Sequence, residues 1–321
     1  MNRRPLLRSA RGPLYVRLGV SSPAWYPRHR LDRCDLTGWR MGTFAQTQTN
    51  TISECMDDLG DLGLVDDGDI VLDEAALTLA RLDHDETDIG PYEDVLSDIA
   101  SRLEEVGAGV DHASERAACL AQVLAGEFGF AGDAETYDDP DNADLIRVID
   151  RLRGLPISLS ILYVAAARRI GWAAEVLSLP GHVLVMVGHE AEPVVIDPFR
   201  GGVPVGVEEI TALFASAKGD ASAAVRHVAA MPNRAILVRL LLNQAIRAEK
   251  AGRGRRALLL YSRMTLIAPD YPHLWWERAR LELIDNDVTA ARASLTAMLE
   301  ITREPTLRER VTSTLDSLAA R

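Results

Sequence analysis

The stretch RLRGLPISLSILYVAAARRIG, residues 151–171, decides how the rest of this sequence is interpreted. Its apolar run from residue 157 to 170 is almost unbroken, which predicts a helix that is buried on most sides. Pro156 suits the first turn of that helix, because a proline there breaks no intrahelical hydrogen bond and already has a helical φ. Gly171 ends the helix. We therefore expect one buried central helix, starting at Pro156.

Three short segments rich in β-branched residues follow this helix: AAEVLSL (173–179), HVLVMV (182–187) and PVVIDP (193–198). Turn-forming residues separate them, which predicts antiparallel strands. If residues 188–193 form the hairpin loop, Val187 pairs with Val194 and His182 pairs with Phe199. His182 and Asp197 are then diagonal neighbours on one sheet face, within reach of a hydrogen bond.

Helical patterns precede the central helix. Apolar residues recur at intervals of three and four in segments 71–82, 92–106 and 113–129, which is the period of an α-helix with one buried face. Residues 130–154 are rich in Gly, Pro, Asn and Asp, which predicts an ordered loop that leads into a short amphipathic helix.

The chain from residue 233 onward is helical in pattern and contains a repeat. After a shift of 34 residues, Leu241 falls on Trp275, Ala245 on Ala279, Ala257 on Ala291, Tyr261 on Leu295, Met264 on Met298 and Ile267 on Ile301. Small residues recur where helices must approach closely, and Pro269 separates the two units. The pattern resembles a pair of tetratricopeptide repeats. The expected fold class is α+β: a helical N-terminal part, a core with a small antiparallel sheet, and an all-α repeat region.

The charge of the chain is unevenly distributed. The formal net charge is −12, yet residues 1–40 hold nine Arg against Asp32 and Asp35. These residues have neither a helical nor a strand period, and arginines interrupt their apolar pieces. We expect residues 1–50 to be a disordered leader or a mis-assigned start, with Met41 as the true first residue; an organelle transit peptide is the weaker alternative.

Composition excludes several classes of function. The acidic chain would repel a phosphate backbone, so nucleic acid is not expected as the main ligand. No apolar run approaches the roughly 20 residues of a membrane span. Three cysteines, Cys34, Cys55 and Cys119, are widely spaced, and none has a second cysteine nearby, which indicates neither a disulfide framework nor a metal site. A reducing cytoplasm is the expected location, and the oligomeric state stays open.

A buried helix followed by strands, with His182 opening one strand and Asp197 ending the next, is the arrangement of the transglutaminase-like papain superfold. The segments FGFAGDAETYDDPDNADLIRVIDRLRGLPISLSILYVAAARRIGW, LPGHVLVMV, IDPFRGG and NRAILVRLLLN together resemble the SirB-type transglutaminase-like proteins. The resemblance implies a transglutaminase-like domain over residues 70–230, tetratricopeptide-like repeats over 231–321, and a bacterial cytoplasmic protein associated with regulation of gene expression.

In the superfold a cysteine at the start of the buried helix is the nucleophile, a histidine is its base and an aspartate orients the histidine. His182 and Asp197 match the last two roles. The nucleophile position, fifteen residues before Gly171, holds Pro156. Ser158 lies about 200° around the helix from it, and Ser160 is one turn deeper, where we expect its hydroxyl to bond a backbone carbonyl. Cys119 lies on an earlier helix. The residues expected to line the cleft are Arg153, Gly154, Pro156, Ser158 and Gly181.

No cofactor is expected. GRGRRA, residues 252–257, has the spacing of a dinucleotide fingerprint, but a helix precedes it where that motif requires a strand.

Residues 226–263 hold nine basic side chains and one acidic, Glu249. This excess is either a solvated helical face or a docking surface for an acidic partner segment. The residues expected to bind a partner are Arg239, Asn243, Arg253, Arg255 and Arg256.

Two classes of function follow. The first is a noncatalytic regulatory or scaffold protein that binds a protein or peptide through the degenerate cleft and the repeats. The alternative is a hydrolase or transferase that uses His182 and Asp197 for acid–base chemistry and takes its nucleophile from water, the substrate or another residue.

Overall fold

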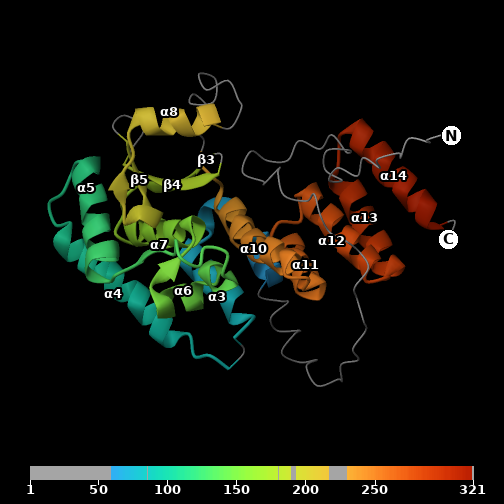
Figure 1. Ribbon diagram of the computed structural model, residues 1–321, viewed down its shortest axis with the longest axis horizontal. Coiled ribbons are helices and arrows are strands. Elements are labelled where there is room, and N and C mark those ends of the chain that lie inside the picture. Colours follow the sequence, from blue (N-terminus) through green and yellow to red (C-terminus); the bar gives the residue numbers. More distant parts are fainter. Residues whose placement is uncertain (1–58, 85, 180, 189–192, 217–229, 320–321) are drawn as a thin grey trace, which may run out of the picture.

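The computed structural model describes residues 59–84, 86–179, 181–188, 193–216 and 230–319 (Figure 1). Helices combine with a four-stranded antiparallel sheet and a two-stranded parallel one, so the expected mixture of helix and sheet is confirmed. The leader expected at residues 1–50 lies outside the described residues, as do Cys34 and Cys55.

Helices form the N-terminal part, as the periodicity predicts. Residues 59–64 are helical and precede a 3-10 turn. The elements that follow are η1 (Asp67–Asp69), α3 (Leu72–Arg81), α4 (Gly90–Val106), α5 (Ala113–Leu120) and the π-helical η2 (Ala121–Glu127). On α3 the apolar residues spaced three and four apart, Leu72, Ala75, Ala76 and Leu79, are all buried.

Helix α7 (Pro156–Arg169) is the centre of the fold. Each of its residues from Ile157 to Ala167 is buried, because α3, α4, α10, β3 and β4 all pack against it. Its last two residues bind neighbouring elements. Arg168 donates to the Ala174 carbonyl at 3.0 Å and to Asn233 Oδ1 at 2.8 Å, and Arg169 Nε lies 2.7 Å from the buried Asp73 carboxylate.

The four-stranded sheet has the order β3-β4-β5-β6. Its strands are β3 (Ala174–Leu179), β4 (His182–Val187), β5 (Val194–Asp197) and β6 (Val203–Pro204). Val187 pairs with Val194, as predicted. The predicted pair of His182 with Phe199 is not formed, because the chain leaves the sheet after Asp197 and turns into the 3-10 helix η4 (Pro198–Arg200).

The loop between η2 and α7 is ordered by a buried amide. It contains β1 (Ala131–Gly132), η3 (Pro140–Ala143), α6 (Leu145–Arg151) and β2 (Arg153–Gly154). Asn142 is fully buried; its Nδ2 donates to the Thr136 carbonyl at 2.8 Å, and its own carbonyl accepts the Leu155 N–H at 2.9 Å. The loop is thereby fixed against the start of α7.

The C-terminal part consists of helices that pack in sequence (Figure 1). After α8 (Val207–Ser216) come α10 (Asn233–Lys250), α11 (Gly254–Ile267), α12 (Pro272–Ile284), α13 (Val288–Ile301) and α14 (Pro305–Ala319). Helix α12 ends 34 residues after α10, and α13 ends 34 residues after α11. The alanine and methionine pairs of the predicted repeat, 245 and 279, 257 and 291, and 264 and 298, are all buried. The predicted period is therefore present in the helix ends and in the core.

Two carboxylates tie the N-terminal part to the helical pairs. Asp67 accepts the backbone N–H groups of Asn233 and Arg234 at 2.9 and 2.8 Å, and so caps α10 from a distant segment. Asp83 accepts from the guanidinium groups of Arg256 and Arg263. Burial acts to raise the pKa of Asp83, but the hydrogen bonds from these two arginines outweigh it and leave the pKa below its ordinary value of 3.8.

We predict that Asp83→Ala lowers the free energy of unfolding at pH 7 by about 3 kcal/mol, because it leaves two arginines without their carboxylate. The difference between the wild type and the variant should narrow as the pH falls below 3.8, since a carboxylate with a depressed pKa loses its stabilising contribution on protonation. Urea denaturation monitored by circular dichroism measures both effects. Glu105→Ala is the control, because Glu105 pairs with Arg102 on the exposed face of α4; equal losses in the two variants would contradict the prediction.

Candidate functional site

A pocket of about 350 Å³ lies at the N-terminus of α7. The start of β4, the end of β5, η4 and α8 form its walls, and Tyr137 from the preceding loop closes one side. We call it the α7 pocket. Its polar lining residues are His182, Asp197, Arg200 and Glu209, and its apolar ones include Pro156, Val183, Phe199, Val205 and Leu213.

The α7 pocket brings together Pro156, Gly181, His182 and Asp197 from the sequence prediction. Pro156 is the first residue of α7, where the superfold has its nucleophile. His182 is exposed at the first position of β4, whereas Asp197 is only 7% exposed. Within the part of the chain that the structure describes, no hydrogen bond joins His182 to Asp197.

Arg200 binds the Asp197 carboxylate, which in the superfold would bind the histidine. Its Nε lies 2.8 Å from Asp197 Oδ2, and its Nη2 donates to Glu209 Oε1 at 2.7 Å. Asp197 also accepts the backbone N–H groups of Phe199 and Arg200. The hydrogen bond that Arg200 donates to Asp197 raises the pKa of Arg200, so this cation remains charged. The acceptors of the Asp197 carboxylate are thus occupied by donors from its own turn.

Tyr163 lies beneath this turn, two helical turns after Pro156 on the same side of α7. It is fully buried, and its hydroxyl has no hydrogen-bond partner among the described residues. Burial, followed by the charge of Asp197, raises the pKa of Tyr163. Gly202 has a φ of +79°, and a Cβ there would approach the Tyr163 ring at 3.1 Å. The phenol therefore stays neutral under a tightly packed turn.

Two aromatic rings form the rim of the α7 pocket. Tyr137 and Phe199 pack edge to face with ring centroids 5.8 Å apart. Arg247 on α10 also contacts the tyrosine: its guanidinium lies 5.6 Å from the ring centroid, and its Nη2 donates to the Tyr137 carbonyl at 3.0 Å. Tyr137 remains 44% exposed, so its ring is available at the mouth of the pocket.

Three residues expected in the cleft lie elsewhere. Arg153 is exposed and donates to the Gly129 and Leu152 carbonyls. Gly154 is buried in β2, where a Cβ would meet Ser158 Oγ at 2.9 Å. The Ser158 hydroxyl is fully buried and donates to the Asn142 carbonyl at 2.7 Å. None of the three lines the α7 pocket.

The remaining nucleophile candidates are also occupied. Ser160 Oγ donates to the Pro156 carbonyl at 2.7 Å, as predicted. Cys119 is buried on α5, where its Sγ lies 3.9 Å from the Val106 carbonyl, and burial raises the pKa of its thiol. Among the described side chains that line the pocket, none is a cysteine, serine or threonine.

The structure distributes the expected partner-binding residues over different surroundings. Arg239 donates to Ser178 Oγ on β3 at 2.6 Å, and burial lowers its pKa to about 10. Asn243 lies one turn further along α10 and donates to the Arg239 carbonyl. Arg253 is exposed at the start of α11, and Arg255 faces Asp285 at 3.6 Å. Arg256 is bound to Asp83, and is therefore not available to a partner in this conformation.

Sequence reasoning missed Tyr137, Arg200 and Glu209. A signal existed for Arg200, because an arginine three residues after an aspartate in a proline turn can fold back on it; Tyr137 and Glu209 reach the pocket only through tertiary packing.

Among the described residues, no group of three or more His, Cys, Asp or Glu side chains could hold a metal ion. None of their helices has the length and apolar character that crossing a membrane requires.

Comparison with known proteins places this geometry in context. Residues 91–242 match the family model of the transglutaminase-like superfamily, Transglut_core2. The UPF0162 protein of Xylella fastidiosa (strain 9a5c) is 29% identical over 244 residues, which cover 75% of this chain and 87% of that protein. The UPF0162 protein of Vibrio cholerae is 28% identical over 207 residues, covering 62% and 74%. The chain thus contains a transglutaminase-like domain and has bacterial homologues.

Two further similarities are more limited. F-box only protein 21 of Mus musculus is 34% identical over 77 residues, which cover 24% of this chain and 12% of that protein. The crystal structure of menin is 12% identical and aligns with a TM-score of 0.36 over 77% of this chain and 70% of menin.

We predict that Asp197→Ala lowers the free energy of unfolding by about 1 to 2 kcal/mol, because it removes the cap of η4 and the partner of Arg200. His182→Ala should change stability little, because the imidazole is exposed and forms no hydrogen bond with Asp197 or Arg200. Thermal and urea unfolding of both variants measure the difference. If His182→Ala destabilises the protein as much as Asp197→Ala, the two side chains act as a pair and the assignment of Asp197 to its own turn is wrong.

Proposed function

We propose that this transglutaminase-like domain is a noncatalytic binding module that receives a side chain of a protein or peptide partner in the α7 pocket. One observation carries the proposal: the nucleophile position holds Pro156, while Arg200 binds the carboxylate that would orient His182. A catalytic triad works as a unit, so loss of the nucleophile and of the orienting contact removes most of the rate enhancement.

The shape of the α7 pocket supports binding. A volume of about 350 Å³ falls within the range of ligand pockets, and mainly apolar walls with a few polar groups are typical of them. Exposed aromatic rings at a pocket mouth, such as that of Tyr137, often contribute much of the binding energy in protein interfaces. Arg200 is bound by both lining carboxylates, Asp197 and Glu209, so its positive charge is not available to an acidic partner side chain.

We assign the helical pairs α10–α11 and α12–α13 to the tetratricopeptide type, and the whole chain to the SirB-type proteins that it resembles. The 34-residue period and the buried small residues support the first assignment. Regulation of gene expression is then the process in which the bound partner acts, and the dispersed cysteines favour the cytoplasm as its location.

The alternative, a hydrolase or transferase, is favoured by the exposure of His182 beside the pocket. Such an enzyme would use the imidazole as a base for water or a substrate hydroxyl. It would also require Asp197 to leave Arg200, or the histidine to act without an orienting carboxylate.

A turnover assay separates the two classes. Purified protein is incubated with glutamine-containing peptides and a primary amine, and ammonia release and peptide cleavage are followed by mass spectrometry. We expect no product beyond that formed by the His182→Ala variant. Turnover that the wild type has and His182→Ala lacks would overturn the proposal in favour of the enzyme.

A binding experiment tests the module itself. Peptides are selected on the full chain from a random displayed library, and their affinities are measured by fluorescence polarisation. We expect Tyr137→Ala to weaken the selected peptides at least tenfold, because the ring leaves the pocket mouth. Leu259→Ala is the matched control, since Leu259 is similarly exposed, at 45%, on the remote helix α11. Peptides that bind Tyr137→Ala as tightly as the wild type would place the docking surface elsewhere.

A further inference from the structure

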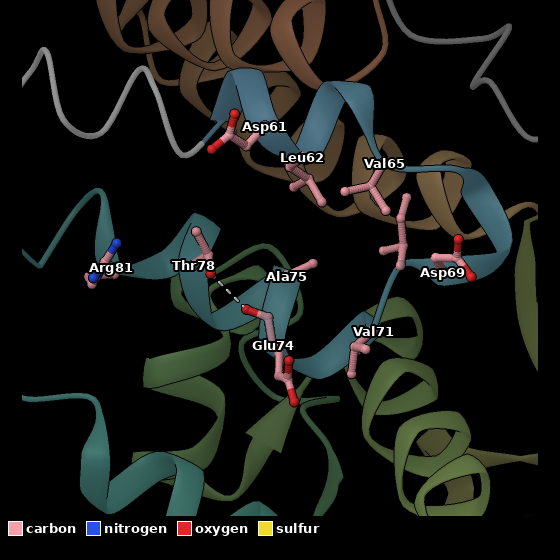
Figure 2. A pocket seen from close by; sticks show the side chains of 10 residues that line it. Asp61, Leu62, Val65, Asp69, Val71, Glu74, Ala75, Thr78 and Arg81 are labelled. Atoms are coloured by element: carbon pink, nitrogen blue, oxygen red, sulfur yellow. Dashed lines mark hydrogen bonds between the residues drawn. The ribbon is translucent and has the colours of Figure 1, made fainter.

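A second hollow, unrelated to the α7 pocket, lies where the described chain begins. It has a volume of about 400 Å³ and runs between the helical segment 59–64 and α3 (Figure 2). Its apolar lining comes from Leu62, Val65, Ile70, Val71 and Ala75. Val65 and Val71 are 37% and 46% exposed. We call this hollow the N-terminal groove; it leaves contiguous apolar surface in contact with water.

Carboxylates surround this apolar surface. Asp61, Asp69 and Glu74 line the groove and are exposed. Within the described part of the chain, no cation pairs with Asp61 or Asp69, and Glu74 has one long contact, 3.3 Å, to Arg169. Arg81, at the end of α3, is the one basic residue of the described lining. An occupant of the N-terminal groove should therefore combine apolar side chains with positive charge.

The chain itself has such a segment. Residues 1–40 hold nine arginines against two aspartates, with leucines and valines between the arginines, as in PLLRSARGPLYVRLGV (5–20). We propose that this arginine-rich segment docks in the N-terminal groove of its own chain, with its leucine and valine side chains on the apolar surface and its guanidinium groups on Asp61, Asp69 and Glu74.

Connectivity favours this occupant over a separate partner. The described chain starts at Leu59, two residues before Asp61. Eighteen residues, 41–58, separate the arginine-rich segment from that point, and a chain of this length spans at most about 60 Å. Every position along the groove is within that reach. Because the segment is tethered, its local concentration is in the millimolar range, so modest contacts suffice to hold it.

The α7 pocket is a poorer site for the same segment, because its carboxylates already bind a cation: Arg200 lies between Asp197 and Glu209.

The N-terminal groove also has a structural link to the helical pairs. Asp67, in the turn between the two walls of the groove, caps α10. A docked segment would thus stabilise the contact between residues 59–70 and α10, a role separate from the proposed binding of a partner.

Paramagnetic relaxation tests the inference in the full chain. A nitroxide is attached to Cys34 in a Cys55→Ser background; Cys119 is buried and stays unlabelled. We expect the backbone amide signals of Val65, Val71 and Thr78 to lose at least half their intensity relative to the reduced, diamagnetic sample. Signals from α14, which lies far from α3 in Figure 1, report the background.

Charge reversal supplies the matched comparison. Asp61→Lys, Asp69→Lys and Glu74→Lys together should restore the groove signals, whereas the same number of reversals on the exposed face of α4, Asp94→Lys, Asp98→Lys and Glu104→Lys, should leave the broadening unchanged. A salt concentration of 0.5 M should act like the groove variant, because it screens exposed charges. No broadening at the groove in the wild type, or equal broadening in both triple variants, would overturn the inference. Circular dichroism confirms that each variant is folded.

Discussion

Burial of α7 on all sides is the constraint on which the rest of the structure depends. A helix whose residues 157–167 are all buried must be covered by sheet on one side and by helices on the others. Its N-terminus then has to lie where the ends of β4 and β5 meet, and this is the position of the α7 pocket. The arginines at its C-terminus bind Asp73 and Asn233. The site and the link to the helical pairs are therefore opposite ends of one element.

The same helix explains how the noncatalytic site that we propose keeps the shape of a catalytic one. Proline at the first helical position satisfies the backbone as well as cysteine would, because that N–H needs no partner. The Asp197 carboxylate keeps a structural task, since it caps the 3-10 turn that closes β5. Arg200 then replaces the histidine as its charged neighbour. The pocket remains because packing and capping maintain it, and neither depends on turnover.

Local patterns predicted much of this structure. The helical period located α3 and α4, the apolar run after Pro156 located α7, and the turn between the strands fixed the Val187–Val194 register. Contacts between distant residues were not predictable in this way. The basic residues of α10 and α11 suggested one outward surface, but Arg256 meets Asp83, which is 173 positions away in the chain. Net charge along a segment does not reveal which charges the fold neutralises.

The capping of α10 by Asp67 affects the order in which the parts of the protein can fold. The first N–H groups of a helix need acceptors, and here those acceptors lie 166 and 167 residues earlier in the sequence. The match to the transglutaminase-like superfamily likewise runs to residue 242, inside α10. Helix α10 is thus stabilised by contacts with the domain that precedes it, as well as being joined to it in sequence. The N-terminus of α10 gains its cap only when the segment around Asp67 is in place, so the N-terminal portion and α10 should fold and unfold together.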